Sequence, residues 1–416
     1  MLNFLNKFNI INNNQFGFRQ GHSTELAITK FYEDILTNLN NNHANFALFL
    51  DLSKAFDSVN RDILLSKLYI YGIRGIPFKL IKSYLTNRTQ YLEVNKIKSD
   101  PCPTTIGVPQ GSILSPLLFL ILINDFKNTT NLKLINFADD TLVYGLINDT
   151  NNIKQKLNEE FNNIINWIKI NHLKLNYKKT NFLIFSPKTN KFKTLQNLKY
   201  LGNNNNNRIE RKTQYKYLGL MVDQDFNWKS HLLELQTKLS KSVGIIYRVR
   251  NILNKSSLNK LLHSLIISHV KYGIICYGRA NKTSLKPIKI LYNQAIRCIN
   301  FLKRADKNLK QLYLDQKVLS LENIFKLEVG KFCFKYKRDL LPNSFSNFFT
   351  EIGEIHNHST RNFKNKLYLK KQNKKAGILT LAHTGAKLWN SFPTSLQNNN
   401  NVHSFCKNLK IYLTGL

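Results

Sequence analysis

One acidic residue lies inside an otherwise apolar run, and this arrangement restricts the fold more than any other feature of the sequence. Residues 47–52 read Ala-Leu-Phe-Leu-Asp-Leu, the pattern of a buried strand that carries Asp51. A buried carboxylate is unfavourable unless a metal ion or a partner compensates its charge. The run therefore indicates a functional site. The alternative is a strand-end aspartate that caps the following helix.

A second acidic site strengthens the functional interpretation. Two β-like segments, 133–137 and 141–144, are joined by Ala138-Asp139-Asp140, which predicts a hairpin with both carboxylates at its turn. Asp is common in turns for backbone reasons alone, but these flanks are too apolar for a solvated turn. Adjacent carboxylates raise each other's pKa unless cations lie between them, so we expect a divalent-metal site. Ligands that are all oxygen atoms favour Mg²⁺, with Mn²⁺ as the alternative.

The charge of the chain indicates a polyanionic partner. Its 416 residues include 61 Lys plus Arg against 25 Asp plus Glu, a formal net charge of +36. The basic residues are spread along the chain rather than gathered on one amphipathic helix, which favours nucleic acid over a membrane surface. The longest apolar run, 113–123, is too short to span a bilayer and predicts a buried helix. We therefore expect no membrane partner.

Two further features bear on the compartment. The N-terminus lacks a long apolar stretch with a small-residue cleavage site. The five cysteines are widely scattered without paired spacing, which argues against a disulfide framework and against a structural zinc site. We expect an intracellular protein, nuclear or cytoplasmic, whose thiols are reduced.

Several segments carry a combined signal in their order and spacing. They are Gln15–Thr24, Phe49–Asp57, Gln110–Phe119, Phe137–Asp140, residues 173–185, and Tyr217–Gly219 with Asp223, Trp228 and His231. The run Asp-Leu-Ser-Lys-Ala-Phe-Asp at 51–57 is the most specific of them. In this order the segments resemble the reverse transcriptases of non-LTR retrotransposons, in particular the jockey-like LINE elements. The resemblance covers about residues 1 to 300, and the remainder more loosely.

The resemblance implies an α+β fold: a right-hand polymerase palm with partial fingers, followed by a mainly helical thumb and C-terminal region. The predicted domains are residues 1–235 for partial fingers and palm, 236–300 for the thumb-like region and 301–416 for a basic C-terminal region of unknown role. The implied function is that of an RNA-directed DNA polymerase of a mobile element. Such an enzyme extends a DNA primer 3′-hydroxyl on an RNA template with deoxynucleoside triphosphates, by two-metal nucleotidyl transfer. Nothing in the sequence bears on the oligomeric state.

Individual roles also follow from the resemblance. Asp51, Asp139 and Asp140 would be the catalytic carboxylates and metal ligands. Leu52 would complete the metal site and touch the nucleotide. Phe56 would be a steric gate that excludes a 2′-hydroxyl, with plain core packing as the alternative.

The loop that contains Gln110 and Gly111 would face the nucleotide. Gln110 would contact the incoming nucleotide and the template base, and Gly111 would permit close backbone approach, unless it is an ordinary loop glycine. Arg19 is the nearest basic candidate for the triphosphate.

The remaining roles concern the leaving group and the primer. Lys179 is the candidate general acid for the departing pyrophosphate, and a solvated charge pair with Lys178 is the alternative. Tyr217, Leu218 and Gly219 would grip the primer terminus, with palm-edge packing as the alternative.

The sequence also predicts local structure. Ser115-Pro116 is a good N-cap and first-turn pair for a helix over 117–126. Asp57 is expected to cap or orient the helix that ends near Gly72, rather than to bind metal. We expect the asparagine runs 12–14, 203–207 and 398–401 to be loops.

Residues 232–300 are expected to be mainly helical and basic. Within them, Lys238, Lys241, Arg248 and Arg250, interleaved with Tyr247, should follow a duplex backbone, with affinity that falls steeply with salt.

Some parts of the family pattern are missing from the sequence. They are the finger strands that normally precede Gln15, an upstream endonuclease domain and a downstream Cys/His knuckle, so a copy truncated at its N-terminus is expected. The alternative to an active polymerase is a catalytically impaired retrotransposon remnant that only binds nucleic acid. An RNA-templated RNA polymerase shares the double-Asp hairpin, but Phe56 argues against it.

Overall fold

The computed structural model describes residues 1–147, 152–187, 197–199, 208–302, 308–355 and 366–415. Its contacts divide the chain into two compact units. The first unit contains residues 1–27 and 44–212, and the second contains residues 28–43 and 213–416. The predicted loops at residues 12–14 and 398–401 are confirmed, whereas residues 203–207 lie outside the described residues.

A six-stranded sheet forms the centre of the first unit within the described ranges, in the order β6-β7-β1-β8-β10-β9. All neighbours are antiparallel except β8 and β10. Its strands are β1 (Ala44–Leu50), β6 (Lys133–Phe137), β7 (Asp140–Ile147), β8 (Asn181–Phe185), β9 (Asn197–Lys199) and β10 (Arg208–Arg211). Strand β1 is buried along its whole length, as its apolar run predicts.

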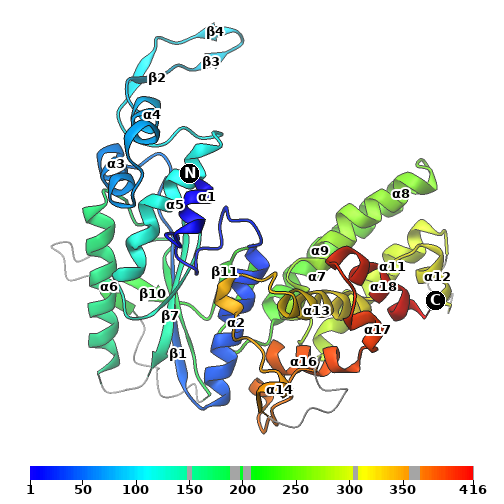
Figure 1. Cartoon of the computed structure of the whole chain (residues 1–416). Helices are drawn as coiled ribbons and strands as arrows, with labels where there is room; N and C mark the ends of the chain where they lie inside the picture. Colours follow the sequence, from blue (N-terminus) through cyan, green and yellow to red (C-terminus); the bar gives the residue numbers. More distant parts are fainter. Residues whose placement is uncertain (148–151, 188–196, 200–207, 303–307, 356–365, 416) are drawn as a thin grey trace. The chain divides into compact units, whose positions relative to one another are not determined.

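Helices of the first unit pack on one face of this sheet. The helices are α1 (Leu2–Lys7), α3 (Arg61–Ile70), α4 (Gly75–Leu85), α5 (Leu114–Ile123), the 3₁₀ helix η1 (Asn124–Asn128) and α6 (Ile153–Ile170). Figure 1 shows α5 and α6 running beside the strands. Alternate side chains of β1, Phe46, Leu48 and Leu50, share one hydrophobic core with α3, α5 and α6. The predicted buried helix is therefore confirmed over Leu114–Ile123.

The starts of two helices differ from the prediction. Helix α5 begins at Leu114, not at residue 117, because the Ser115 hydroxyl donates a hydrogen bond to the Pro109 carbonyl (2.5 Å) instead of capping a helix end. Helix α3 is capped by Asn60, whose side chain accepts from the backbone N–H of Ile63 (3.0 Å). Asp57 is therefore not the cap of α3.

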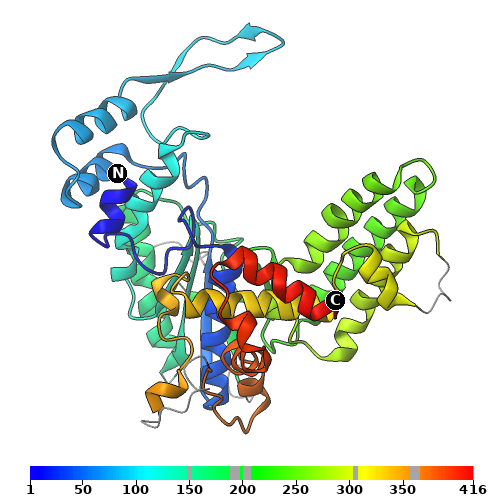
Figure 2. The same cartoon turned by 45° about the vertical axis from the view of Figure 1, so that its right-hand side comes forward.

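An exposed two-stranded ribbon belongs to the same unit. It consists of β2 (Arg88–Gln90) paired with β5 (Cys102–Thr104), and β3 (Glu93–Val94) paired with β4 (Ile97–Lys98). Figure 2 shows it extending beyond α3 and α4. Arg61 fixes its base, since its guanidinium donates to the carbonyl of Thr104 (2.5 Å) and its Nε to that of Gly107 (2.8 Å).

The second unit is mainly helical, as predicted for residues 232–300. Its only described strands form a hairpin, β11 (Gln214–Tyr217) with β12 (Leu220–Asp223). Its helices are residues 28–40 of α2 (Thr24–Asn40), α7 (Lys229–Val249), α8 (Lys255–Leu261), the π-helix η3 (Leu262–Ile267), α9 (Ser268–Lys271), α10 (Ile274–Tyr277), α11 (Lys282–Ile299), α12 (Leu309–Asp315), α13 (Leu321–Lys337), the 3₁₀ helix η4 (Asn343–Phe345), α14 (Ile352–Ile355), α15 (Lys375–Ile378), α16 (Leu381–Ser391), α17 (Thr394–Gln397) and α18 (Val402–Thr414).

A buried ion pair ties distant parts of this unit together. The Glu33 carboxylate on α2 accepts a 2.6 Å hydrogen bond from Arg279, and both side chains are buried. The same carboxylate accepts from the backbone N–H groups of Leu381 (2.5 Å) and Ala382 (3.2 Å) at the start of α16. The C-terminal region is thus part of the packed core of the unit rather than an appendage.

The predicted α+β fold followed by a mainly helical region is confirmed. The second compact unit includes β11–β12, because this hairpin packs against α7, and the predicted domain bounds of 1–235, 236–300 and 301–416 stay a prediction. The subdivision into partial fingers, palm and thumb stays a prediction. In the described parts of the chain, all five cysteines are free, and no helix is both long and apolar enough to cross a bilayer.

Candidate active site

Asp51 directly follows the buried strand β1. Its backbone N–H donates to the hydroxyl of Thr180 (3.2 Å), and its carbonyl accepts from the N–H of Asn176 (2.8 Å). Leu52 then forms an isolated antiparallel bridge with Leu175. The segment before β8 therefore fixes the backbone of Asp51 where the strand leaves the sheet.

Asp139 and Asp140 lie at the turn of the β6–β7 hairpin, as predicted. Phe137 pairs with Asp140, which leaves Ala138 and Asp139 as the two turn residues. Ala138 has a φ of +56°, in the left-handed region that alanine seldom adopts. Something outside the hairpin must therefore hold this turn.

Residues 15–17 hold the turn of the β6–β7 hairpin in place. Phe16 donates its N–H to the Asn136 carbonyl (2.7 Å), so this segment runs beside β6. The buried side-chain oxygen of Gln15 accepts from the backbone N–H groups of both Gly17 (2.8 Å) and Ala138 (3.1 Å). A Cβ on Gly17 would come within 2.3 Å of the Ala138 nitrogen, so only glycine fits there.

Sequence reasoning missed the supporting role of Gln15 and Gly17. Both residues belong to Gln15–Thr24, one of the segments that carry the resemblance, and the sequence assigned neither of them a role of its own. Ala138 is 123 residues away from Gln15, so no local periodicity or spacing connects the two. A glycine two residues after a buried glutamine is too common a pattern to indicate such a contact.

The register of the sheet brings Asp51 and Asp140 together. Strand β1 pairs with β7 from Ala44↔Ile147 to Leu50↔Thr141, and continuing that register by one residue places Asp51 opposite Asp140. Directly opposed residues of antiparallel strands are about 4.5–5.5 Å apart and point to the same face. The two strands therefore deliver both carboxylates to one end of the sheet.

The pKa values of the hairpin carboxyls reflect this crowding. Partial burial raises the pKa of Asp139, and the negative charge of Asp51 adds to the effect. Partial burial, then the charges of Asp139 and Asp51, raise the pKa of Asp140 to about 6, although Lys179 opposes the shift and the residue keeps exposed surface. The ionised carboxylates repel one another, so a cation between them would be strongly favoured.

The donor set fits a hard divalent cation. Three carboxylates and nearby backbone carbonyls supply oxygen ligands only, which are those that Mg²⁺ and Mn²⁺ prefer. In the described residues, however, no group of three or more His, Cys, Asp or Glu side chains is already arranged to hold an ion. The carboxylates would therefore have to reorient their side chains to share one.

Phe56, Gln110 and Gly111 lie on the loops around this end of the first unit. The half-buried Phe56 ring stacks on Phe119 (4.7 Å between centroids, 25° between planes), so it is held from behind by α5. Gln110 donates its side-chain N–H to the Asp57 carboxylate (2.7 Å). Gly111 is exposed, has a φ of +78° and would meet nothing within 4 Å if it carried a Cβ. Their nucleotide-binding roles stay predictions.

Arg19 and Lys179 differ in how far they are engaged. One guanidinium nitrogen of Arg19 donates to the carbonyls of Asn12 (2.9 Å) and Gln15 (3.3 Å), and burial lowers its pKa. Arg19 thus already braces the loop that contains Gln15. Lys179 is exposed, and its charge reaches Asp140 strongly enough to lower the pKa of that carboxyl.

Of the predicted primer-grip residues, Leu218 and Gly219 form the turn of the β11–β12 hairpin in the second unit, whereas Tyr217 ends β11 and is buried. Leu218 and Gly219 have φ values of +44° and +82°. The Tyr272 hydroxyl donates to the Leu218 carbonyl (2.5 Å), and a Cβ on Gly219 would approach that ring within 3.1 Å. Tyr272 therefore fixes the shape of this turn, and contact with a primer stays a prediction.

The chain resembles known proteins in sequence over most of its length. The family described as "Reverse transcriptase (RNA-dependent DNA polymerase)" matches residues 1–222. The "Probable RNA-directed DNA polymerase from transposon BS" of Drosophila melanogaster is 29% identical over 305 residues, which cover 70% of this chain and 33% of the relative. The "RNA-directed DNA polymerase from mobile element jockey" of the same species is 28% identical, with 69% and 32% covered. The chain spans about a third of the length of these relatives.

Two solved telomerase structures also resemble the chain weakly. Telomerase from Candida albicans, bound to a fragment of telomeric RNA, gives a TM-score of 0.42 at 11% identity and covers 77% of this chain and 57% of its own. Apo telomerase from Candida tropicalis gives 0.39 at 11% identity, with 85% and 58% covered. TM-scores of this size do not establish a shared overall fold.

Proposed function

The chain belongs to the reverse transcriptase (RNA-dependent DNA polymerase) family, and on this premise we propose that it extends a DNA primer on an RNA template with deoxynucleoside triphosphates. The relatives are named as polymerases of mobile elements, and we extend that role to this chain, which spans about a third of their length. The sheet of the first unit would be the palm. The single observation that carries the proposal is the strand register that places Asp51 opposite Asp140, beside Asp139.

Asp51, Asp139, Asp140 and the backbone carbonyl of Leu52 would hold the metal ions. Burial, with the added charges of Asp139 and Asp51, raises the pKa of Asp140 to about 6, and this supports the assignment because bound cations would offset the unfavourable charge. Two Mg²⁺ ions at this place would activate the primer 3′-hydroxyl and neutralise the triphosphate and the departing pyrophosphate. The contribution of the protein is a fixed backbone under each carboxylate. Thr180 supports that of Asp51 and Gln15 that of the hairpin turn.

The surrounding side chains would select and position the nucleotide. Phe56, backed by Phe119, would face the sugar and reject a 2′-hydroxyl. Gln110 would contact the nucleotide and template base, and its bond to Asp57 limits its orientation. Gly111 leaves open space for close approach of the backbone. Arg19 would reach the phosphates through guanidinium N–H groups other than those of the nitrogen that binds the Asn12 and Gln15 carbonyls, or by leaving these carbonyls.

Lys179 would donate a proton to the leaving pyrophosphate. It is exposed, and its charge acts on Asp140, which supports a place near the hairpin carboxylates. Lys178 is exposed as well. A Lys179→Ala variant that loses extension rate with little change in nucleotide affinity, beside an unaffected Lys178→Ala, would distinguish proton donation from general surface charge.

The basic residues of α7 would follow the backbone of the template–primer duplex. Lys238 already forms an ion pair with Glu234 (3.0 Å), and Glu234 also pairs with Lys216 (2.6 Å). Part of the positive charge of Lys238 is therefore compensated within the protein. Tyr247 is 59% exposed at the far end of the helix. Binding of a duplex should weaken steeply as salt is raised, because phosphate contacts release counterions. The turn of Tyr217, Leu218 and Gly219 would hold the primer end.

Primer extension tests the proposal. Purified protein, an RNA template with an annealed DNA primer, Mg²⁺ and the four deoxynucleoside triphosphates should give extended primer, and Asp140→Ala should abolish it. Asp100→Ala, which removes an exposed carboxylate from the β-ribbon, should extend as the wild type does. Equal extension by wild type and Asp140→Ala would overturn the site. No extension by wild type, with duplex binding retained, would overturn the activity and support the alternative of a remnant that only binds nucleic acid.

The choice of sugar separates the polymerase classes. Wild type should use deoxynucleotides and reject ribonucleotides, and Phe56→Val should relax that preference by opening the space beside the sugar. Preferential use of ribonucleotides by the wild type would support an RNA-templated RNA polymerase instead.

A further inference from the structure

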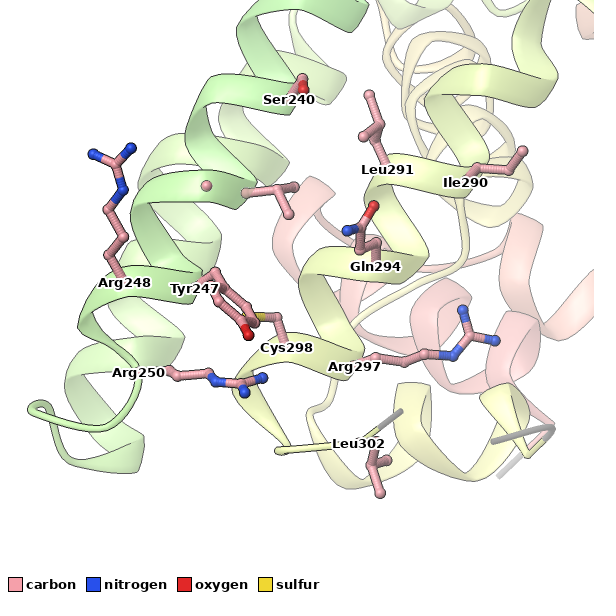
Figure 3. A pocket seen from close by; sticks show the side chains of 12 residues that line it. Ser240, Tyr247, Arg248, Arg250, Ile290, Leu291, Gln294, Arg297, Cys298 and Leu302 are labelled. Carbon is pink, nitrogen blue, oxygen red and sulfur yellow. The ribbon is translucent and has the colours of Figure 1, made fainter. Parts of the chain in front are cut away.

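The second unit contains a cavity of about 530 Å³ between the C-terminal halves of α7 and α11. Figure 3 shows its lining side chains in the gap between the two helices. Its volume falls within the range of about 300–1,000 Å³ that is usual for small-molecule sites. Tyr247, Arg248 and Arg250 line it and also belong to the basic stretch proposed to follow a duplex, but that role does not involve the interior of the cavity.

The walls of the cavity combine apolar, aromatic and basic groups. Among the described residues, three arginines and no acidic side chain line it. The Arg250 guanidinium lies over the exposed ring of Tyr247, 4.2 Å from its centroid. In Figure 3, Tyr247, Arg250 and Gln294 lie in the gap, whereas Arg248 and Arg297 extend to opposite sides of it. The chemistry is that of a site for an anionic ligand with a flat, partly polar ring.

A glycine keeps the α7 wall open. Gly244 lies inside α7, where glycine is less stable than alanine. A Cβ built on it would meet nothing within 4 Å, so close packing does not require glycine at this position. Gly244 also lines the cavity. The missing side chain therefore leaves room in the cavity without serving helix packing.

We propose that this cavity binds one unpaired nucleotide of a nucleic acid. The base would stack on Tyr247, as bases stack on aromatic side chains in single-strand binding proteins. Gln294 offers an amide that both donates and accepts, which suits the edge of a base. Arg250 would bind the adjoining phosphate through a charge-assisted hydrogen bond. A base in a continuous duplex stack cannot enter such a cavity, so the site selects nucleotides that lie outside the stack.

The cavity thus differs from the proposed role of the α7 surface. Contacts of that surface with a duplex need only phosphates, whereas this cavity needs a base that is free to leave the helix. An apolar peptide is a poorer match, because Arg250 in the gap and the two further arginines among the described lining residues favour an anion.

Matched RNA duplexes test the proposal without any need for polymerase activity. One duplex is fully paired, and the other carries a single bulged 2-aminopurine at its centre. Fluorescence anisotropy gives the affinity of each, and 2-aminopurine emission reports stacking of the bulged base. The wild type should bind the bulged duplex at least about five-fold more tightly, the lower end expected for one stacked base, and should quench its emission.

Substitutions at Gly244 make the test specific. Gly244→Leu should fill the cavity and remove both the preference and the quenching, with unchanged affinity for the paired duplex. Gly244→Ala adds only a methyl group and should keep both. Gly353→Leu is the matched control, because Gly353 is another exposed helical glycine with open space around its Cβ position. If Gly244→Leu does not fold, Tyr247→Ala, at an exposed ring, replaces it and should remove the quenching.

Three results would overturn the proposal. The first is equal affinity of the wild type for the two duplexes. The second is a preference that survives both Gly244→Leu and Tyr247→Ala. The third is displacement of the bulged base by an apolar peptide and not by a mononucleotide, which would assign the cavity to a protein partner.

Discussion

Replacing Gln15 with methionine removes one acceptor that two buried backbone N–H groups share. The Gln15 side-chain oxygen accepts from Gly17 (2.8 Å) and from Ala138 (3.1 Å), and Gln15 is only 4% exposed. Methionine has a similar length and leaves no large cavity, so the change is confined to these two hydrogen bonds. Each buried N–H that is left without a partner costs about 1–3 kcal/mol. Because Ala138 can relax from its left-handed conformation, we expect a loss near the lower limit of the sum, about 2–3 kcal/mol.

Urea denaturation measures this loss as the change in the free energy of unfolding of Gln15→Met. Gln20→Met places the same substitution at an exposed glutamine of the same loop and should change stability by less than about 0.5 kcal/mol. Gln15→Met should also reduce the rate of Mg²⁺-dependent primer extension with little change in duplex affinity, because the turn that carries Asp139 is no longer fixed. Wild-type stability and wild-type extension by Gln15→Met would refute the role of Gln15.

Three further predictions concern charged or titrating groups. In metal-free buffer at neutral pH, Asp140→Asn should be more stable than wild type by about 1 kcal/mol or less after solvent screening. The reason is that the raised pKa of Asp140 means that the folded state disfavours its charge. Added Mg²⁺ should make wild type the more stable of the two in thermal unfolding. Burial lowers the pKa of His231 to about 4, so the unfolded chain binds more protons than the folded chain between about pH 4 and 6.5. The free energy of unfolding should therefore fall by roughly 2 kcal/mol from about pH 7.5 to about pH 5. In urea titrations, His231→Phe should lack this part of the decrease. Arg279→Met should cost about 3–5 kcal/mol because it leaves the Glu33 carboxylate buried without its ion partner, whereas the double variant with Glu33→Leu should recover part of the loss; equal stability of the single variant and wild type would contradict the assignment.

The buried strand β1 and the β6–β7 hairpin, with the carboxylates that they carry, could be predicted because they follow from binary patterning. An apolar run with one acid predicted β1 and the position of Asp51. Two β-like segments around Asp139 and Asp140 predicted the hairpin. Local signals of this kind involve neighbours within a few residues. The register between β1 and β7 came from the structure, because β1 is buried on both faces and its apolar pattern does not distinguish one register from the next.

The predicted start of α5 and the predicted cap of α3 were wrong for an identifiable reason. Ser115 and Asp57 both have the side chains of good caps, but each finds another partner: Ser115 the Pro109 carbonyl and Asp57 the Gln110 amide. Capping preferences are worth about 1 kcal/mol, so one tertiary hydrogen bond can override them.

Long-range contacts were beyond the reach of sequence patterns. Gln15 meets Ala138 across 123 residues, and Glu33 meets Arg279 across 246. The sequence therefore showed no role for the C-terminal region, although its α16 is joined to α2 through Glu33. The sequence did not predict the cavity beside Gly244 either, because this cavity depends on how α7 and α11 pack.

Cleavage by a bound iron ion tests the metal centre most directly, because it does not require activity. Fe²⁺ accepts oxygen ligands and, with ascorbate and peroxide, generates radicals that cut the nearest backbone. We predict cuts close to Asp51 and close to Asp139–Asp140, identified by mass spectrometry, that excess Mg²⁺ suppresses and that Asp51→Asn loses. Cuts confined to other segments, or cuts at these places that persist in Asp51→Asn, would contradict a shared metal site between β1 and the β6–β7 hairpin.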